Sequence, residues 1–253
     1  MTLTIRKRMI QHIPVLEVVP TEFLNEPLSL VIYYHGWQTK KELALTASKK
    51  IAQENIRVIL PDSMYHGERK IENRSMIPSF VFWSTLQYNL SEFPMIKNFY
   101  QKRGLIQEDN LGVAGFSMGG MTTAALLTRY PEIKVAAILM GSPNFESFIS
   151  RTAAYIQKEE GHYPDYLVDL FSWTKTYDLS KMPEKIAGRP LYFWHGTDDQ
   201  KLPYDVTYQF YRDHKDQVYG RQMSFETGEG EPHILTIDIM NKTGKFFVQH
   251  FSD

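Results

Sequence analysis

The chain has 253 residues, of which 43% are hydrophobic and 23% charged, and its formal charge at pH 7 is -1. This length and composition suit one large α/β domain or two small ones. No basic stripe stands out along the chain, which argues against nucleic acid as a partner. Cysteine is absent, which excludes disulfides, thiolate metal sites and a cysteine nucleophile.

The N-terminal segment carries basic residues, but no apolar run of signal-peptide length follows them. No stretch of the sequence approaches the length and hydrophobicity of a transmembrane helix. We therefore expect a soluble, cytoplasmic protein that does not associate with membranes.

The first quarter of the chain predicts the start of an α/β sheet. Alternating residues at 2–8 and 13–19 predict a β-hairpin at the edge of that sheet. An apolar strand is expected at 28–34, a helix at 41–54 and a second buried strand at 56–60. Strand, helix and strand joined by short links predict parallel pairing with right-handed crossovers.

The rest of the chain continues this alternation. An aromatic-rich helical region is expected over 75–103, packed on the sheet and partly overhanging a site. Further strands are expected at 133–140, 190–194 and 222–226, with helices at 203–214 and 234–250. Residues 144–188 break the rhythm, because their length exceeds that of a simple crossover. We expect a single domain over residues 1–253, with 144–188 as an inserted helical cap.

One pentapeptide stands out in this pattern: Gly115-Phe116-Ser117-Met118-Gly119. A short apolar strand precedes it, and a stretch of small and aliphatic residues with helical character follows. Strand, Gly-x-Ser-x-Gly and helix together predict a nucleophile elbow, a strained turn that projects the Ser117 hydroxyl above the sheet. The alternative is an ordinary turn between a strand and a helix.

A serine nucleophile needs a base within hydrogen-bond reach and a carboxylate that orients the base. In this motif the acid follows the serine and precedes the histidine in chain order. Asp198 and Asp199 both follow the expected strand at 190–194 directly. Each is a candidate for the acid, and each could instead be a turn-forming residue.

Three histidines follow these acids in the sequence. His214 falls within a polar helix, and His250 lies on a helix near the C-terminus that is prone to fraying. His233 sits in a loop between a strand and a helix, where an imidazole can reach over the edge of the sheet. We therefore predict that His233 is the base.

The segment His35-Gly36-Trp37 follows the strand at 28–34. A glycine at this point lets the loop turn toward the serine, so the backbone N–H of Trp37 is predicted to form an oxyanion hole with that of Met118. His35 precedes the acid and is expected to brace the loop, and His66 and His195 are interpreted in the same way. No histidines show metal-ligand spacing, so no metal and no other cofactor is expected.

These motifs resemble those of α/β-hydrolase-fold serine hydrolases, a fold with a mostly parallel central sheet flanked by helices. Within that superfamily the chain is most similar to small bacterial esterases related to the prolyl-oligopeptidase catalytic domain and to dienelactone-hydrolase-like proteins. The resemblance rests on the order and spacing of five stretches from about residue 28 onward: His35-Gly36-Trp37, Pro61-Asp62 with His66-Gly67-Glu68-Arg69, the elbow with Gly120, the segment 195–203, and His233.

The segment 195–203 reads His-Gly-x-x-Asp-x-x-Leu-Pro, and its match to the family pattern assigns the acid to Asp199. The chain also departs from its relatives. Fewer than thirty residues precede the first strong strand, so we expect the large N-terminal propeller of prolyl-oligopeptidase-group peptidases to be missing. Dienelactone hydrolases proper use a cysteine nucleophile, and this chain has none.

The resemblance implies a carboxylesterase that cleaves small esters through Ser117, Asp199 and His233, with an acyl-enzyme intermediate. A serine peptidase or amidase and a thioesterase would use the same residues. A non-catalytic binding protein on this fold is an alternative of a different class. The abundant aromatic residues suggest a closed apolar pocket for short esters, or ordinary core packing. The residues that we expect to line such a pocket are Trp37, Tyr65, Phe82, Trp83 and Phe145.

Overall fold

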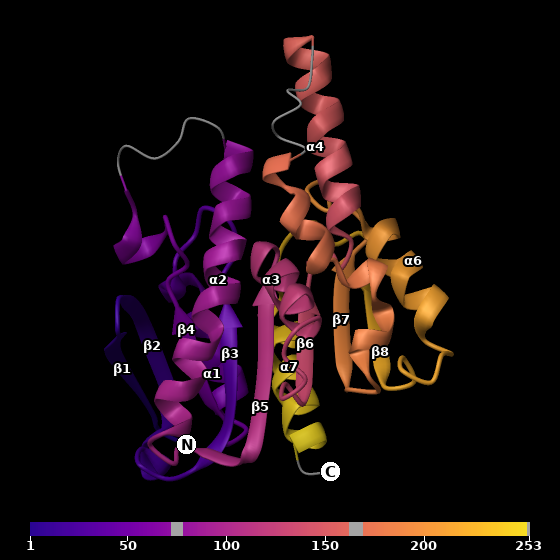
Figure 1. Cartoon of the computed structure of the whole chain (residues 1–253). Helices are drawn as coiled ribbons and strands as arrows, with labels where there is room; N and C mark the ends of the chain where they lie inside the picture. The colour runs from indigo at the N-terminus through magenta and orange to yellow at the C-terminus, as the bar shows by residue number, and fades with distance from the viewer. Residues whose placement is uncertain (72–77, 162–168, 252–253) are drawn as a thin grey trace.

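The computed structural model describes residues 1–71, 78–161 and 169–251. A single sheet of eight strands runs through the described part of the molecule, with helices on both faces (Figure 1). The strands are β1 (Leu3–Ile10), β2 (Ile13–Pro20), β3 (Leu28–Tyr34), β4 (Arg57–Pro61), β5 (Ile106–Phe116), β6 (Val135–Leu139), β7 (Leu191–Gly196) and β8 (Met223–Gly228).

The strand order across the sheet is β1-β2-β4-β3-β5-β6-β7-β8. β1 pairs antiparallel with β2, and β2 pairs antiparallel with β4. Every remaining pair of neighbours is parallel. The predicted edge hairpin and the mostly parallel sheet are therefore both confirmed.

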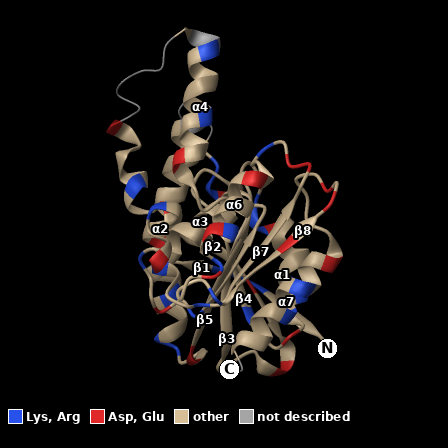
Figure 2. Cartoon of the chain, turned by 90° about the vertical axis from the view of Figure 1, so that its right-hand side faces the viewer, with Lys and Arg blue, Asp and Glu red and all other residues tan. Residues whose placement is uncertain are grey.

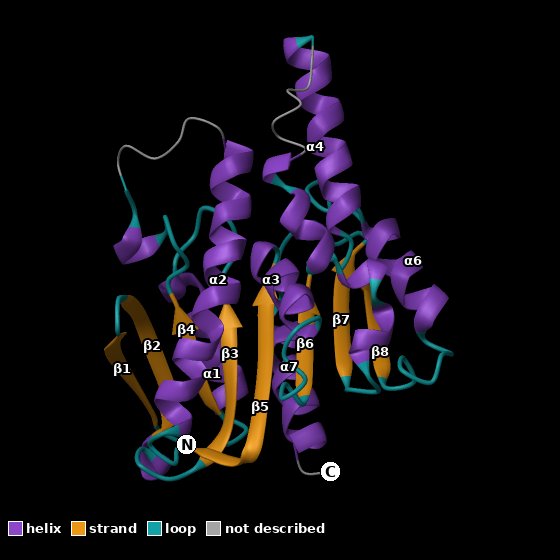
Figure 3. Cartoon of the chain, in the orientation of Figure 1, coloured by secondary structure: helices purple, strands orange, loops and turns teal. Residues whose placement is uncertain are grey.

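Six α-helices and several short 3₁₀ helices connect the strands in the described residues (Figure 3). Residues 75–77 of the expected helical region and residues 162–168 of the expected cap lie outside the described part. The 3₁₀ helices between residues 144 and 188 are η4 (Ser172–Thr176), η5 (Leu179–Lys181) and η6 (Pro183–Ile186). The α-helices are α1 (Leu45–Ala52), α2 (Pro78–Gln101), α3 (Met118–Leu127), α4 (Phe145–Glu160), α6 (Tyr204–His214) and α7 (Ile237–Phe251).

The alternation of side chains along each buried strand divides the core into two layers. Leu30 and Ile32 of β3 pack on the face that α2 and α3 cover. Val31 and Tyr33 of the same strand pack on the opposite face, which α1 and α7 cover. Both faces of β3 are apolar because both are buried, as is typical of a parallel sheet with helices on each side.

The strand that leads to Ser117 and the helix expected at 41–54 differ most from prediction. β5 begins at Ile106, several residues before the apolar run at its end, and this early part carries exposed residues. Backbone pairing of Ile106 with Leu28 of β3 extends the strand there, and an irregularity in register follows. The helix expected at 41–54 is split, because residues Lys41–Ala44 form a 3₁₀ turn before α1 begins.

The parallel strands all end at one side of the molecule. In Figure 1 this is the side from which α4 projects, while both termini lie at the opposite side. Charged residues of both signs are mixed over the helices and loops, and the strands inside are largely uncharged (Figure 2). Among the described helices, none combines the length and the hydropathy that crossing a membrane requires. Because the parallel strands end on the same side, the loops that follow them lie together at the side from which α4 projects. This is where ligands of such sheets bind.

Candidate active site

Ser117 occupies the tight turn between β5 and α3, with φ 56° and ψ -116°. A non-glycine residue in this region is strained by about 1–3 kcal/mol, so the surrounding structure must hold it in place. A Cβ atom on Gly115 would lie 2.2 Å from the carbonyl oxygen of Gly119, and one on Gly119 would lie 2.0 Å from that of Tyr34. The two glycines of the pentapeptide are therefore required by close backbone packing, and the predicted elbow geometry is present.

Asp199 lies buried in the turn after β7 and accepts four hydrogen bonds. Its Oδ1 accepts from the backbone N–H groups of Lys201 at 2.8 Å and Leu202 at 3.0 Å. Its Oδ2 accepts from Nδ1 of His233 at 2.7 Å and from Nε2 of His195 at 3.0 Å. Burial by itself would raise the pKa of Asp199, but the hydrogen bonds from the histidines and from Leu202 outweigh it, so the pKa lies well below its ordinary value. The side chain is a carboxylate.

His233 lies in the loop between β8 and α7, and the aromatic ring of Phe116 lies 4.9 Å from its own. Because the carboxylate of Asp199 can only accept, Nδ1 of His233 carries the proton and Nε2 is left as an acceptor. Backbone groups also hold this loop to the turn that follows β7. The N–H of Asp198 donates to the carbonyl of Glu231 at 3.1 Å, and the N–H of Gly230 donates to Oγ1 of Thr197 at 2.8 Å.

A cavity of about 430 Å³ opens at this edge of the sheet. Ser117 and His233 line it, together with Trp37 and Met118, the residues whose backbone N–H groups were predicted to form the oxyanion hole. Asp199 does not line the cavity, and it is joined to His233 by the hydrogen bond from Nδ1. The structure thus brings all five predicted residues to one place, with the serine, the histidine and the two amide-bearing residues around a single space.

The loop that carries Trp37 is braced by two histidines. Nδ1 of His35 donates to the carbonyl of Gly36 at 2.9 Å, and its Nε2 accepts from the N–H of Ser63 at 3.1 Å. Nε2 of His66 accepts from the N–H of Gln38 at 3.0 Å. Burial lowers the pKa of His35 to about 4, so this imidazole is neutral at pH 7. Both histidines act on loop geometry, as their position in the sequence indicated.

A buried ion cluster holds the neighbouring loop at 62–69. Nζ of Lys41 lies 2.5 Å from Asp62 and 2.6 Å from Glu68, and Asp62 also accepts the backbone N–H groups of Lys41 and Glu68. Burial opposes the charge of Lys41, but these carboxylates outweigh it and raise the pKa of the ammonium. These ion pairs therefore fix the loop at 62–69, and His66 of this loop in turn accepts a hydrogen bond from the loop that carries Trp37.

The expected pocket residues divide into two groups. Trp37 and Phe82 line the cavity, with their rings 5.4 Å apart. Trp83 and Phe145 instead pack against each other in the core, with ring centroids 5.2 Å apart and almost no exposed surface. Tyr65 packs edge-on against Tyr88. Trp83, Phe145 and Tyr65 therefore do not line the cavity.

Other residues of the site were missed by the sequence analysis. His195 was interpreted as structural, but it contacts the same carboxylate oxygen as His233. Several cavity residues adjoin the recognised motifs, and their place in chain order was the only available signal. These are Gln38, Thr39, Phe116, Met121, Lys201 and Leu202, to which α4 adds Phe148 and Thr152.

Within the described part of the chain, no three or more histidine, aspartate or glutamate side chains are grouped so as to hold a metal ion. The polar groups of the cavity wall include the hydroxyl of Ser117, the imidazole of His233 and the backbone amides of Trp37 and Met118. Such a set suits nucleophilic attack on a carbonyl carbon with stabilisation of the resulting oxyanion.

The chain is similar to two curated proteins. It is 37% identical over 210 residues to "Putative esterase YitV" of Bacillus subtilis, and the match covers 82% of each chain. It is 28% identical over 254 residues to "Esterase YjfP" of Escherichia coli, covering 97% of this chain and 98% of the other.

Solved structures share the fold at low sequence identity. TT1662 from Thermus thermophilus superimposes with a TM-score of 0.80 at 18% identity, and the match covers all of both chains. Est1E from Butyrivibrio proteoclasticus gives a TM-score of 0.71 at 14% identity, covering 98% of this chain and all of the other. The predicted α/β-hydrolase fold is therefore confirmed. A family model described as the prolyl oligopeptidase family matches residues 87–253, and with the similarity to the Bacillus protein this shows that the chain belongs to that family.

Proposed function

We propose that this protein is a serine hydrolase that cleaves carboxylic esters, with Ser117 as nucleophile, His233 as base and Asp199 as the acid that orients it. The observation that carries the proposal is the 2.7 Å contact between Asp199 and His233, beside a cavity that His233 and the strained Ser117 both line. The esterase names of the two curated relatives support the same reaction.

The reaction proceeds by two acyl transfers. Nε2 of His233 takes the proton of Ser117 as Oγ bonds to the ester carbonyl carbon, and the carbonyl oxygen becomes an oxyanion. The backbone N–H groups of Met118 and Trp37 donate to this oxyanion. When the carbon–oxygen bond of the ester breaks, His233 returns the proton to the leaving alcohol. Water then attacks the acyl carbon with His233 as base, the bond from this carbon to Oγ of Ser117 breaks, and Oγ takes the proton back from His233 as the carboxylic acid leaves. Asp199 stabilises the imidazolium each time.

The cavity favours short, uncharged acyl groups. Its wall is built largely from Trp37, Phe82, Phe116, Met121 and Phe148, and its volume of about 430 Å³ lies in the lower part of the range for small-molecule sites. Lys201 and His233 are the ionisable side chains on the described wall. We expect faster turnover of short-chain p-nitrophenyl esters than of long-chain ones, and equal activity on both would contradict the size limit.

Labelling with a fluorophosphonate probe tests the proposal. We expect wild type to be labelled and Ser117→Ala to be unlabelled, with ester hydrolysis lowered by several orders of magnitude. Ser91→Ala, a change at an exposed serine of α2, is the matched control and keeps both signals. A folded wild-type protein that takes no label would overturn the proposal and favour a binding protein.

The same assay set separates the esterase from its closest chemical alternatives. Aminoacyl anilides report on peptidase or amidase activity, which the family of this chain makes the strongest rival. Acyl-CoA substrates report on thioesterase activity. Higher kcat/KM on either class than on small esters would reassign the substrate while leaving Ser117, His233 and Asp199 in their roles.

A further inference from the structure

A second cavity, of about 300 Å³, lies next to the first on the other side of His233. The two cavities share four wall residues: Gly36, Thr39, Phe116 and His233. The first extends toward the face of the sheet covered by α2 and α3, and residues of those helices and of α4 line it. The second extends toward the face covered by α1 and α7, which contribute Ala47 and Met240 (Figure 1).

The chemistry of the acyl-enzyme decides which part of an ester each cavity can hold. The acyl group becomes covalently bound to Oγ of Ser117, so it must occupy the space that Ser117 lines. Ser117 lines the first cavity and does not line the second. The leaving alcohol takes its proton from His233 and must therefore lie beside that imidazole. His233 lines both cavities, and the second is the cavity beside it that Ser117 does not line.

We propose that the second cavity is the binding site for the alcohol portion of the substrate, and that this portion is apolar and uncharged. The inference rests on the proposed esterase function and adds the class of ester, one with an apolar group on each side of the carboxyl. In the acylation step the alcohol's carbon–oxygen bond to the carbonyl breaks, the oxygen takes the proton from Nε2 of His233, and the neutral alcohol departs from this cavity.

The wall of the second cavity explains the chemical class. No lysine, arginine, aspartate or glutamate of the described residues lines it. Leu43 and Ile234 line it while being 68% and 49% exposed, so the wall includes two large apolar side chains that are in contact with water. Covering them with an apolar alcohol group removes that surface from water, which is favourable. The volume is at the lower limit for ligand sites and suits a short alkyl or benzyl group.

Two sets of esters test the assignment. The first keeps the acetyl group and varies the alcohol, and its readout is the alcohol ratio, kcat/KM for benzyl acetate divided by that for methyl acetate. The second keeps methanol and varies the acid, and its readout is the acyl ratio, kcat/KM for methyl hexanoate divided by that for methyl acetate. Leu43→Asn places a polar side chain in the wall of the second cavity, and Ala44→Leu fills part of that cavity.

We expect the alcohol ratio to fall about tenfold in each of these two variants while the acyl ratio stays at the wild-type value. Phe148→Ala, which changes the first cavity only, should alter the acyl ratio and leave the alcohol ratio unchanged. Val218→Asn is the matched control for a polar change at an exposed apolar side chain. Val218 is 75% exposed and precedes β8, whereas His233 follows β8, so Val218 lies at the end of this strand away from the cavities and both ratios should be unchanged.

A burst experiment with p-nitrophenyl acetate gives a second readout. The alcohol has left before water attacks, so Leu43→Asn and Ala44→Leu should change acylation and leave the deacylation rate at its wild-type value. A folded, active enzyme whose alcohol ratio moves in neither variant would overturn the assignment, as would an effect on the acyl ratio or on deacylation. A wild-type protein that hydrolyses none of these esters would overturn the esterase function together with the subsite.

Discussion

Nε2 of His195 lies 3.0 Å from Oδ2 of Asp199, the same oxygen that accepts the hydrogen bond from His233. The other neighbour of Nε2 is the carbonyl of Leu202 at 2.9 Å, and because both neighbours are acceptors, Nε2 carries the proton. His195 is completely buried, and its Nδ1 has no hydrogen-bond partner in the described structure. A second imidazole therefore fixes the orientation of the Asp199 carboxylate and withdraws charge from it.

Replacing His195 by phenylalanine should lower kcat/KM by about tenfold to a hundredfold, the usual effect of losing one hydrogen bond to a charged group. With one donor fewer, the carboxylate of Asp199 becomes more basic and stabilises protonated His233 more strongly. The acid limb of the pH profile of kcat/KM should therefore move to higher pH. His195→Gln, which keeps an N–H donor, should recover part of the activity. If the pH profile of kcat/KM is unshifted in the folded phenylalanine variant, His195 contributes only to core packing.

Gly119→Ala should destabilise the protein by several kcal/mol, because its Cβ would lie 2.0 Å from the carbonyl oxygen of Tyr34 and backbone must move. Urea unfolding followed by circular dichroism measures this. Gly104→Ala is the control: it has φ +63° but nothing within 4 Å of the added Cβ, so it should cost only about 1 kcal/mol. Equal losses in the two variants would show that crowding at the elbow is not what selects glycine.

The order of strands and helices could be predicted from the sequence because each element carries a local pattern long enough to identify it. The early start of β5 could not, since the pairing of Ile106 with Leu28 depends on backbone atoms that leave no side-chain signal. The motif residues Ser117, Asp199 and His233 meet because all three follow strands of one parallel sheet, and that follows from topology alone.

The lining of the pocket was harder to predict because it depends on packing between elements. Phe145 and Phe148 lie on one face of α4, yet Phe145 is buried against Trp83 while Phe148 reaches the cavity. Phe82 and Trp83 are adjacent in α2, and only Phe82 reaches the cavity. All four side chains are aromatic. Which ring reaches the cavity depends on how α2 and α4 pack against their neighbours, and sequence patterns do not contain that packing.

His35→Gln should reduce the pH dependence of folding stability. Burial lowers the pKa of His35 to about 4, so between about pH 6.5 and 4 the unfolded chain binds a proton at this site that the folded chain does not. Stability from this group is therefore complete above pH 6.5 and falls as the pH is lowered, by about 2 kcal/mol between pH 7 and 5.

Glutamine can both donate to Gly36 and accept from Ser63, but it does not titrate. We therefore expect the loss of unfolding free energy between pH 7 and 5, measured with urea, to be about 2 kcal/mol smaller in the variant than in wild type. A difference of the same size at both pH values would indicate that the substitution changes contacts rather than protonation.

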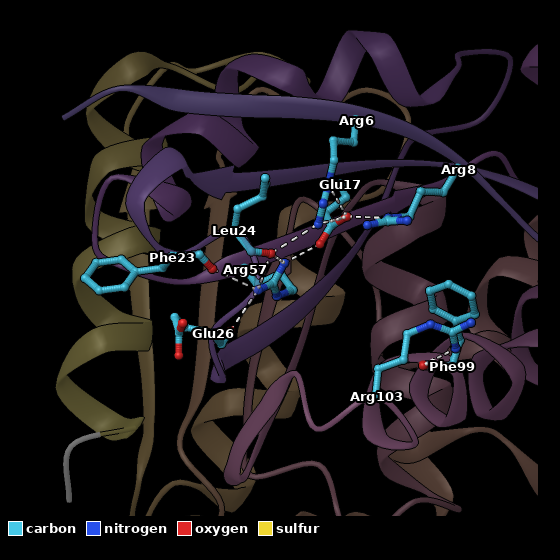
Figure 4. A network of polar contacts seen from close by, with 9 residues as sticks. All are labelled: Arg6, Arg8, Glu17, Phe23, Leu24, Glu26, Arg57, Phe99 and Arg103. Carbon is cyan, nitrogen blue, oxygen red and sulfur yellow. Dashed lines mark hydrogen bonds and ion pairs between the residues drawn. The ribbon is translucent and has the colours of Figure 1, made fainter.

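Glu17 lies on the edge hairpin and is surrounded by cations (Figure 4). Its carboxylate lies 2.5 Å from Nε of Arg8 and 2.9 Å from Arg6, and it also pairs with the fully buried Arg57. Arg57 in turn donates to three carbonyls of the segment that follows β2, those of Phe23, Leu24 and Glu26. The cluster ties the antiparallel edge of the sheet to β4.

Burial alone would raise the pKa of Glu17, but hydrogen bonds from Arg6 and Arg8 and the charge of Arg57 outweigh it and lower the pKa. A lowered carboxyl pKa gives stability above about pH 4.5 that is lost as the pH falls through the folded-state value. Glu17→Gln should destabilise the protein by about 3–5 kcal/mol at pH 7, because it leaves the guanidinium of Arg57 buried beside two other cations.

The control for this change is Glu132→Gln, at a partly exposed carboxylate that pairs with Lys97 at 2.7 Å. It should cost less than about 1 kcal/mol in the same urea titration, because solvent screens the pair. As the pH falls from about 4.5 through the lowered pKa of Glu17 in the folded state, the stabilities of wild type and Glu17→Gln should converge, since the wild-type carboxyl becomes protonated over this range. We expect convergence because both proteins then lack the negative charge at residue 17, wild type by protonation and the variant by substitution. A constant difference in unfolding free energy at all pH values would instead mean that the glutamine disturbs packing around residue 17.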